Sequence, residues 1–162
     1  MRLIIIGAGG HGQVVREVAV SLKKYLTENN MENIIFLDDR YREAFNIEQR
    51  YGTIAYNITG ICENYWKYID EETEFYPAFG DNVKRLEWEE KISQTGGKIA
   101  TIIHPTAYIA ESVKIKSGTV IFPKAIVNSG CEIGHACIIN MGAIIDHGCI
   151  LEDGCHINSG AI

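Results

Sequence analysis

Residues 127–162 read VNSGCE, IGHACI, INMGAI, IDHGCI, LEDGCH and INSGAI, which are consecutive hexapeptides in one frame. The frame extends back without insertion to Ile103, so ten units fill residues 103–162. The first position of every unit is Ile, Val or Leu, and the fifth is Ala, Val, Thr or Cys. This period is typical of a parallel β-helix, in which each unit forms one short strand and a turn. Three units close one triangular coil, so the repeat predicts three coils and one additional strand.

The repeat also explains most of the cysteines. Cys131, Cys137, Cys149 and Cys155 all occupy position five, where we expect them to point into the coil as small apolar residues. Stacked strands lie about 4.8 Å apart, which allows disulfides between successive coils by distance alone. Parallel side-chain directions and a reducing compartment argue against such bonds. The inward orientation also argues against an acyl-cysteine intermediate.

The first half of the chain has a different pattern. Residues 2–6 predict a buried strand, and the loop GAGGHG follows at residues 7–12. Apolar residues at helical spacing then predict a helix over residues 13–26. Residues 34–37 predict a second, parallel strand. Glycines let phosphate oxygens approach the backbone, and free N–H groups at a helix start bind them. The alternative is a tight turn that binds nothing. The polar ring of His11 inside the loop favours binding instead, because an ordinary turn has no use for it.

A second glycine loop follows later in this half. Residues 74–79 predict a strand, in which Pro77 indicates an edge or an irregularity. Gly80 follows, and either Asp81 or Asn82 is expected to cap a helix that ends before residues 96–97. We expect Gly80 to face the first glycine loop. A short helix near residues 61–69 and a last strand over residues 98–103 complete this part.

Composition limits the function classes. The chain has 162 residues, 46% of them apolar, and a net charge of −6. No basic patch stands out, which argues against nucleic acid as a partner. No apolar run approaches the length of a membrane span, and no signal peptide is recognisable, so we expect a cytoplasmic protein. The patterns divide the chain into a Rossmann-like nucleotide-binding domain over residues 1–98 and a β-helix domain over residues 99–162.

A nucleotide-binding half with GAGGHG and LDD, followed by coils with IDHGCI and CHINSG, resembles the sugar acyltransferases of the sialic acid O-acetyltransferase type. This family includes the UDP-4-amino-sugar (bacillosamine-type) N-acetyltransferases. The resemblance covers the whole chain and implies left-handed coils, a homotrimer, acetyl-CoA as co-substrate and no metal. It also implies that the glycine loop holds a UDP-amino sugar or related sugar rather than NAD.

The resemblance assigns roles to individual residues. His147 matches the general base of the family, and His156 matches a histidine that contacts acetyl-CoA. A bacillosamine-type relative carries an acid directly after the base, whereas this chain has Gly148 there and Asp146 before it. The residues expected to contact the nucleotide sugar are Gly9, Gly10, His11, Asp38, Asp39 and Gly80.

These patterns predict transfer of an acetyl group from acetyl-CoA to an amino group, or a hydroxyl, of a nucleotide-linked sugar. Three alternatives remain open: a sialic acid O-acetyltransferase, an NAD-binding oxidoreductase, and a non-catalytic trimeric sugar-binding scaffold. Solenoids need a terminal cap, and none follows the last hexapeptide. We therefore expect a truncated form of a longer protein, with weakened trimerisation, poor acetyl-CoA binding and slow turnover.

Overall fold

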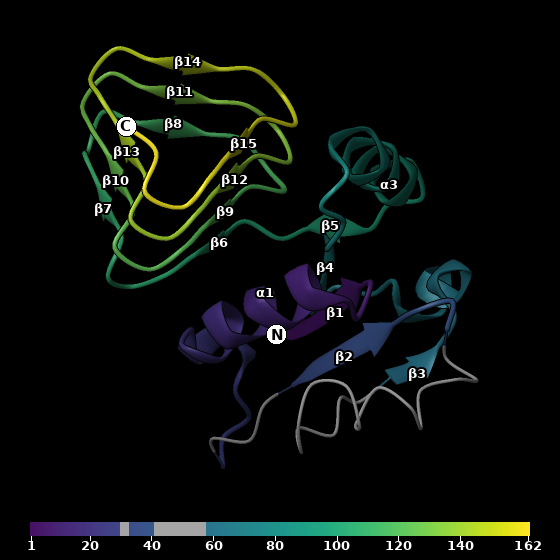
Figure 1. Cartoon of the computed structure of the whole chain (residues 1–162). Coiled ribbons are helices and arrows are strands. Elements are labelled where there is room, and N and C mark those ends of the chain that lie inside the picture. Colours follow the sequence, from purple (N-terminus) through teal and green to yellow (C-terminus); the bar gives the residue numbers. More distant parts are fainter. Residues whose placement is uncertain (30–32, 41–57) are drawn as a thin grey trace.

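The computed structural model describes residues 1–29, 33–40 and 58–162. An α/β part and a triangular coil pack side by side (Figure 1). The elements of the α/β part are β1 (Arg2–Ile6), α1 (Gly10–Val20), a 3-10 turn η1 (Lys23–Tyr25), β2 (Ile34–Leu37), β3 (Ile58–Gly60), a 3-10 helix η3 (Cys62–Tyr68), β4 (Thr73–Pro77), α3 (Asn82–Gln94) and β5 (Lys98–Ile99).

The five strands of the α/β part form one parallel sheet. Their order is β3-β2-β1-β4-β5, and all four strand pairs are parallel. The chain adds strands on one side of β1 and then returns to add β4 and β5 on the other. In such sheets the crevice outside the carboxyl ends of the two strands at the reversal is the usual ligand site. Here that crevice lies beyond β1 and β4.

Several boundaries differ from those predicted from the sequence. The helix α1 begins at Gly10, inside the glycine loop, and ends at Val20, so residues 23–25 form a separate 3-10 turn. The strand β4 is not an edge strand, because it lies between β1 and β5. Pro77 is tolerated there as the last residue of the strand. The single strand predicted over residues 98–103 is two strands in the structure. Lys98–Ile99 forms β5 of the sheet, and Ile102–Ile103 forms the first strand of the coil.

The second half is a left-handed parallel β-helix, as predicted. Its strands lie in three stacks, ordered β13-β10-β7, β14-β11-β8 and β15-β12-β9-β6. The side chains at positions one and five of the units form its core cluster. The strands are β6 (Ile102–Ile103), β7 (Tyr108–Ile109), β8 (Lys114–Ile115), β9 (Val120–Ile121), β10 (Ile126–Val127), β11 (Glu132–Ile133), β12 (Ile138–Ile139), β13 (Ile144–Ile145), β14 (Ile150–Leu151) and β15 (His156–Ile157).

The turns of the coil explain the glycines at position four. From the third unit onward, the residue at this position has a φ between 51° and 76°, which is the left-handed region that favours glycine. Lys124 and Ala136 adopt the same conformation without being glycine. These corners of the coil are therefore tight turns, which let successive strands stack in register.

The prediction for the cysteines is confirmed for three of the four. Cys131 and Cys137 are buried, Cys155 packs at the margin of the core, and all the cysteines are free. The prediction is wrong for Cys149, which is exposed. Cys149 directly precedes β14, which is an edge strand of its stack in the described structure.

Thiol labelling under native conditions tests this arrangement. We expect Cys149 to react first, because its thiol is exposed, whereas Cys131 and Cys137 should react only after unfolding. Mass spectrometry of peptides after brief exposure to iodoacetamide measures the order. Equal labelling of Cys137 and Cys149 in the folded protein would contradict the packing of the coil.

The two parts share one hydrophobic cluster. Outward-facing residues of β6, β9 and β12 (Ile102, Val120 and Ile138) pack with Val15 and Val18 of α1 in this cluster. One face of the coil is therefore buried against the α/β part. The corner between β13 and β14 lies away from both α1 and α3 (Figure 1).

Candidate active site

A pocket of about 500 Å³ lies beyond the carboxyl ends of β1, β2 and β4. It contains all six residues for which the sequence predicted contact with a nucleotide sugar, and so it brings both glycine loops and the acidic pair together. Its lining residues are Gly7, Gly9, Gly10, His11, Asp38, Asp39, Arg40, Cys62, Ala78, Phe79, Gly80 and Lys84.

The glycine loop turns directly into α1. Gly9 is the N-cap residue and has no side chain that could occupy the N–H groups of the first turn. The first turn also contains no acidic residue. These N–H groups and the positive end of the helix dipole are the features that bind phosphate at helix starts. The pocket therefore offers an anion-binding end.

Gly12 is required by close packing within this loop. A methyl group at Gly12 would overlap the carbonyl oxygen of Gly7, which is backbone and cannot move aside, whereas at Gly10 it would meet nothing within 4 Å. Gly12→Ala is therefore expected to lower the free energy of unfolding by about 1–3 kcal/mol, and Gly10→Ala to leave it nearly unchanged. Denaturant titrations of the two variants make the comparison. An equal effect of both would mean that the loop does not have this shape.

The carboxylate of Asp38 organises the pocket from within. One oxygen accepts hydrogen bonds from the Ala8 N–H at 2.8 Å and from Arg40 Nη2 at 3.1 Å. The other accepts from the Arg40 backbone N–H and Nε, at 2.9 and 3.0 Å. Burial alone would raise the pKa of Asp38, but the hydrogen bonds from Arg40 and Ala8 lower it below its ordinary value. Asp38 thus ties the glycine loop to Arg40.

Asp39 has a different role. Its Oδ1 accepts a hydrogen bond from the Cys62 N–H at 3.0 Å, which joins the end of β2 to the start of η3. Asp39 is exposed, and it lines the pocket. It is therefore the member of the acidic pair whose carboxylate is more accessible to a ligand.

Two basic residues of the pocket were missed by the sequence analysis. Arg40 is held against Asp38, and Lys84 lies with its Nζ 4.3 Å from the centre of the Phe79 ring. Both supply positive charge beside the helix N-terminus, as a diphosphate would require. The available signal was their position in the sequence, since Arg40 directly follows the acidic pair and Lys84 lies in the first turn of the helix after Gly80.

His11 lies between the two parts of the molecule. Its ring centroid is 6.2 Å from that of Tyr76 and 6.1 Å from that of Phe122 in the coil. Burial, together with the positive charge of Arg85, lowers its pKa to about 4. Its Nε2 is buried and has no hydrogen-bond partner in the described part of the chain. His11 is thus neutral at pH 7 and retains hydrogen-bonding capacity.

The two histidines singled out in the coil lie at different places. His156 belongs to β15, on the face whose other strands pack against α1, and its Nε2 is 3.1 Å from Asn140 Nδ2. Burial first, and then the charge of Arg85, lowers its pKa. His147 is exposed in the turn between β13 and β14, at the corner away from α1 and α3 (Figure 1). Within one chain, His147 does not join the pocket.

The turn around His147 is held by Asp146. Asp146 Oδ1 accepts hydrogen bonds from the backbone N–H of His147 at 2.7 Å and from Asn128 Nδ2 at 3.3 Å. The bond from the His147 N–H, followed by that from Asn128, lowers the pKa of Asp146. Asp146 therefore remains ionised and supports the turn that presents the His147 ring to solvent.

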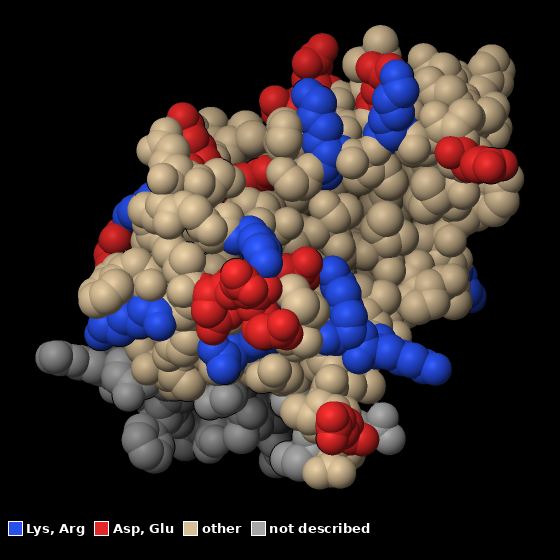
Figure 2. Space-filling model, turned by 180° about the vertical axis from the view of Figure 1, so that it is seen from behind, with Lys and Arg blue, Asp and Glu red and all other residues tan. Residues whose placement is uncertain are grey.

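Charges of both signs are mixed on one face of the molecule. On the face shown in Figure 2, acidic and basic side chains lie close together, and charges of both signs also lie along the top of the coil. In the described ranges, no helix has both the length and the apolar character needed to cross a bilayer.

Comparisons with known proteins agree with this architecture. Residues 2–92 match the model of the PglD N-terminal domain. The UDP-N-acetylbacillosamine N-acetyltransferase of Bacillus subtilis is 29% identical over 117 residues, which are 72% of this chain and 49% of the relative. The chain thus spans about half the length of this curated relative.

Two solved structures resemble the whole chain. The acetyltransferase domain of PglB from Neisseria gonorrhoeae, in complex with acetyl coenzyme A, is 32% identical, with a TM-score of 0.81 over 98% of this chain and 71% of that one. PerB from Caulobacter crescentus, in complex with CoA and GDP-perosamine, is 25% identical, with a TM-score of 0.77 over 96% and 68% of the two chains. On the strength of these matches, the chain belongs to the bacillosamine-type N-acetyltransferase family.

Proposed function

We propose that the protein transfers an acetyl group from acetyl-CoA to the amino group of a UDP-linked amino sugar. The observation that carries the proposal is the pocket, which joins a helix N-terminus, the acidic residue Asp39 and two basic residues in a chain with acetyltransferase relatives. The helix N-terminus, Arg40 and Lys84 suit a diphosphate, and Asp39 suits ribose or base N–H and O–H groups.

In the proposed reaction, His147 is the general base. The sugar amine attacks the thioester carbonyl carbon, a C–N bond forms, and the C–S bond of acetyl-CoA breaks. His147 accepts the proton lost by the amine, and CoA leaves as the thiol after protonation. Histidine suits this role because its ordinary pKa, about 6.5, lies near neutral pH. His156, on the β15-β12-β9-β6 face of the coil, is assigned to acetyl-CoA binding.

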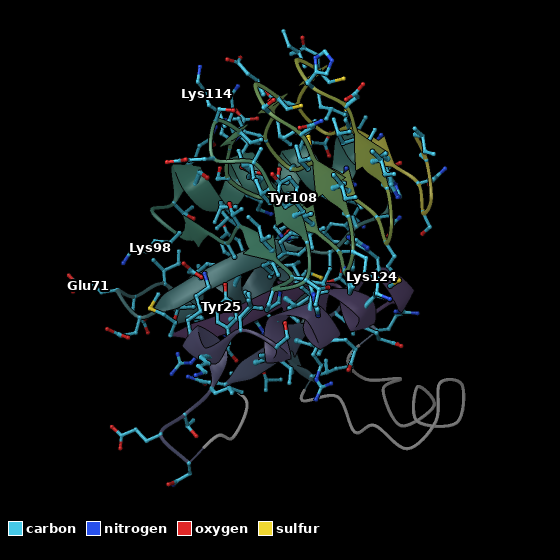
Figure 3. All side chains as sticks on the ribbon, turned by 90° about the vertical axis from the view of Figure 1, so that its left-hand side faces the viewer. Tyr25, Glu71, Lys98, Tyr108, Lys114 and Lys124 are labelled. Carbon is cyan, nitrogen blue, oxygen red and sulfur yellow. The ribbon has the colours of Figure 1, made fainter. Side chains whose placement is uncertain are left out.

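The position of His147 favours a site shared between copies of the chain. The β7-β10-β13 face, which leads into the His147 turn, carries an outward column of Tyr108, Ile126 and Ile144. Tyr108 is 60% exposed and lies on β7, an edge strand of this face (Figure 3). An apolar column of this kind is suited to burial against a second copy. We therefore assign a homotrimer in which the pocket of one subunit faces His147 of another.

The cysteines support a cytoplasmic location as part of the same proposal. All five are free, although Cys137 and Cys155 occupy equivalent positions on successive coils. A fold that uses its cysteines as small core residues rather than in disulfides suits a reducing compartment.

An assay of thiol release from acetyl-CoA tests the function. We expect release with UDP-4-amino sugars and little or none with UDP-N-acetylglucosamine, whose amine is already acetylated. Release with sialic acid alone would support O-acetylation instead. A fluorescence titration with NADH tests the oxidoreductase alternative, and UDP binding with no thiol release from any acceptor would favour the scaffold.

A further inference from the structure

Arg85 has an unusual environment for a charged side chain. It lies in α3 and is fully buried, and none of the ion pairs among the described residues includes it. Its guanidinium instead donates to oxygen atoms on three separate segments. Nε donates to the Ala136 carbonyl at 2.7 Å, Nη1 to the Phe79 carbonyl at 2.8 Å, and Nη2 to the Gly154 carbonyl at 2.9 Å. A buried guanidinium needs this many acceptors, because an unpaired buried charge is strongly destabilising.

Two of these segments belong to the coil. Ala136 and Gly154 occupy position four of the turns at one corner, one coil apart. The helix α3 packs directly on this corner, because a methyl group at Gly154 would meet Leu86 Cδ1 at 2.7 Å. At the turn below, Ser117 Oγ donates to Glu89 Oε1 at 2.7 Å. The contact is therefore close, and it fixes the height of α3 along the coil.

The third segment is the wall of the pocket. Phe79 and Gly80 line the pocket, and their carbonyls face Arg85, at 2.8 and 3.4 Å from Nη1. In a trans peptide the N–H points opposite to the carbonyl, so the Gly80 N–H faces away from Arg85. Arg85 thus fixes the orientation of this loop from behind.

Gly154 connects Arg85 to the part of the coil around His156, which is assigned to acetyl-CoA binding. It lies two residues before His156 in the same turn and strand. The charge of Arg85 also contributes to the lowered pKa of both His11 and His156. Arg85 therefore stands between the nucleotide pocket and the face of the coil assigned to acetyl-CoA.

We infer that Arg85 is a positioning residue for acetyl transfer, which couples the Phe79–Gly80 wall of the pocket to the coil turn that leads to His156. This inference rests on the proposed function. Transfer requires the reacting nitrogen and carbon to approach within about 3–3.5 Å, and a small misplacement lowers the rate greatly. The planar guanidinium of Arg85 donates hydrogen bonds both to the pocket wall and to the coil turn before His156, so it keeps the distance between these two regions constant.

Arg85→Lys is the informative variant, because lysine keeps the charge and lacks the planar fork. We expect kcat to fall roughly 10- to 100-fold, with a much smaller change in the affinity for UDP measured by calorimetry. The matched control is Ile92→Val, a buried change in the same helix that does not touch the pocket. It should reduce stability and leave kcat unchanged. Normal kcat in folded Arg85→Lys would overturn the inference.

Hydrogen exchange gives a readout that does not depend on turnover. UDP should slow amide exchange of peptides covering residues 153–157 in the unmodified chain, and this protection should be lost in Arg85→Lys even though UDP still binds. Equal protection in both proteins, or none in the unmodified chain with UDP bound, would contradict the coupling. If UDP does not bind the unmodified chain, the proposed function fails at its first step and the inference fails with it.

Discussion

Replacing His147 by alanine is expected to lower the acetylation rate by roughly 10²–10⁴-fold, which is the usual contribution of a general base. The affinity for UDP should not change, because His147 is assigned to the sugar amine and not to the UDP part of the substrate. Steady-state rates of thiol release measure the first effect, and calorimetry with UDP measures the second.

His104→Ala is the matched control for this prediction. His104 also lies in a turn of the coil, where its Nδ1 is 2.9 Å from Thr106 Oγ1. It should leave the rate nearly unchanged, since the ring only stabilises its own turn. If His147→Ala is as active as His104→Ala, His147 has no part in the reaction.

Asp38→Ala is expected to have the largest effect on binding. The change removes the acceptor for the Ala8 N–H and for Arg40, so both the glycine loop and a basic residue of the pocket lose their anchor. Hydrogen bonds to charged groups contribute about 1.5–3 kcal/mol each. The affinity for UDP should therefore fall roughly 10- to 100-fold or more.

The control for Asp38→Ala is Asp70→Ala. Asp70 is exposed and pairs with Arg2 at the amino end of β1, opposite the pocket, with 3.5 Å between Oδ2 and Nη1. Calorimetry with UDP should give an unchanged affinity for this variant. Equal affinities of the two variants would show that Asp38 does not organise the nucleotide site.

The sequence predicted the coil well because its pattern is strictly periodic. In each unit the same positions face inward, so Val127 and Ile145 could be placed in the core from spacing alone. Cys149 was misplaced because position five is buried only where another coil packs over it. A local repeat contains no information on which of its coils are covered.

The site could be predicted less completely. The glycine loop and the acidic pair have local signatures, and the structure brings them into one pocket. Arg85 has none, since its partners Gly154 and Ala136 lie 69 and 51 residues away. Only the packing of α3 on a corner of the coil reveals that the helix face with Arg85, Glu89 and Ile92 is buried. Contacts of this range depend on how the two parts dock.

The most direct test of the account is complementation between two inactive variants. Asp38→Ala weakens the nucleotide pocket and His147→Ala removes the base, so each homotrimer should have little activity at a UDP-sugar concentration far below saturation. If every site combines the pocket of one subunit with His147 of another, refolding an equal mixture should restore about a quarter of the normal activity towards a UDP-4-amino sugar. A mixture that forms mixed trimers and stays as inactive as its two components would contradict the account.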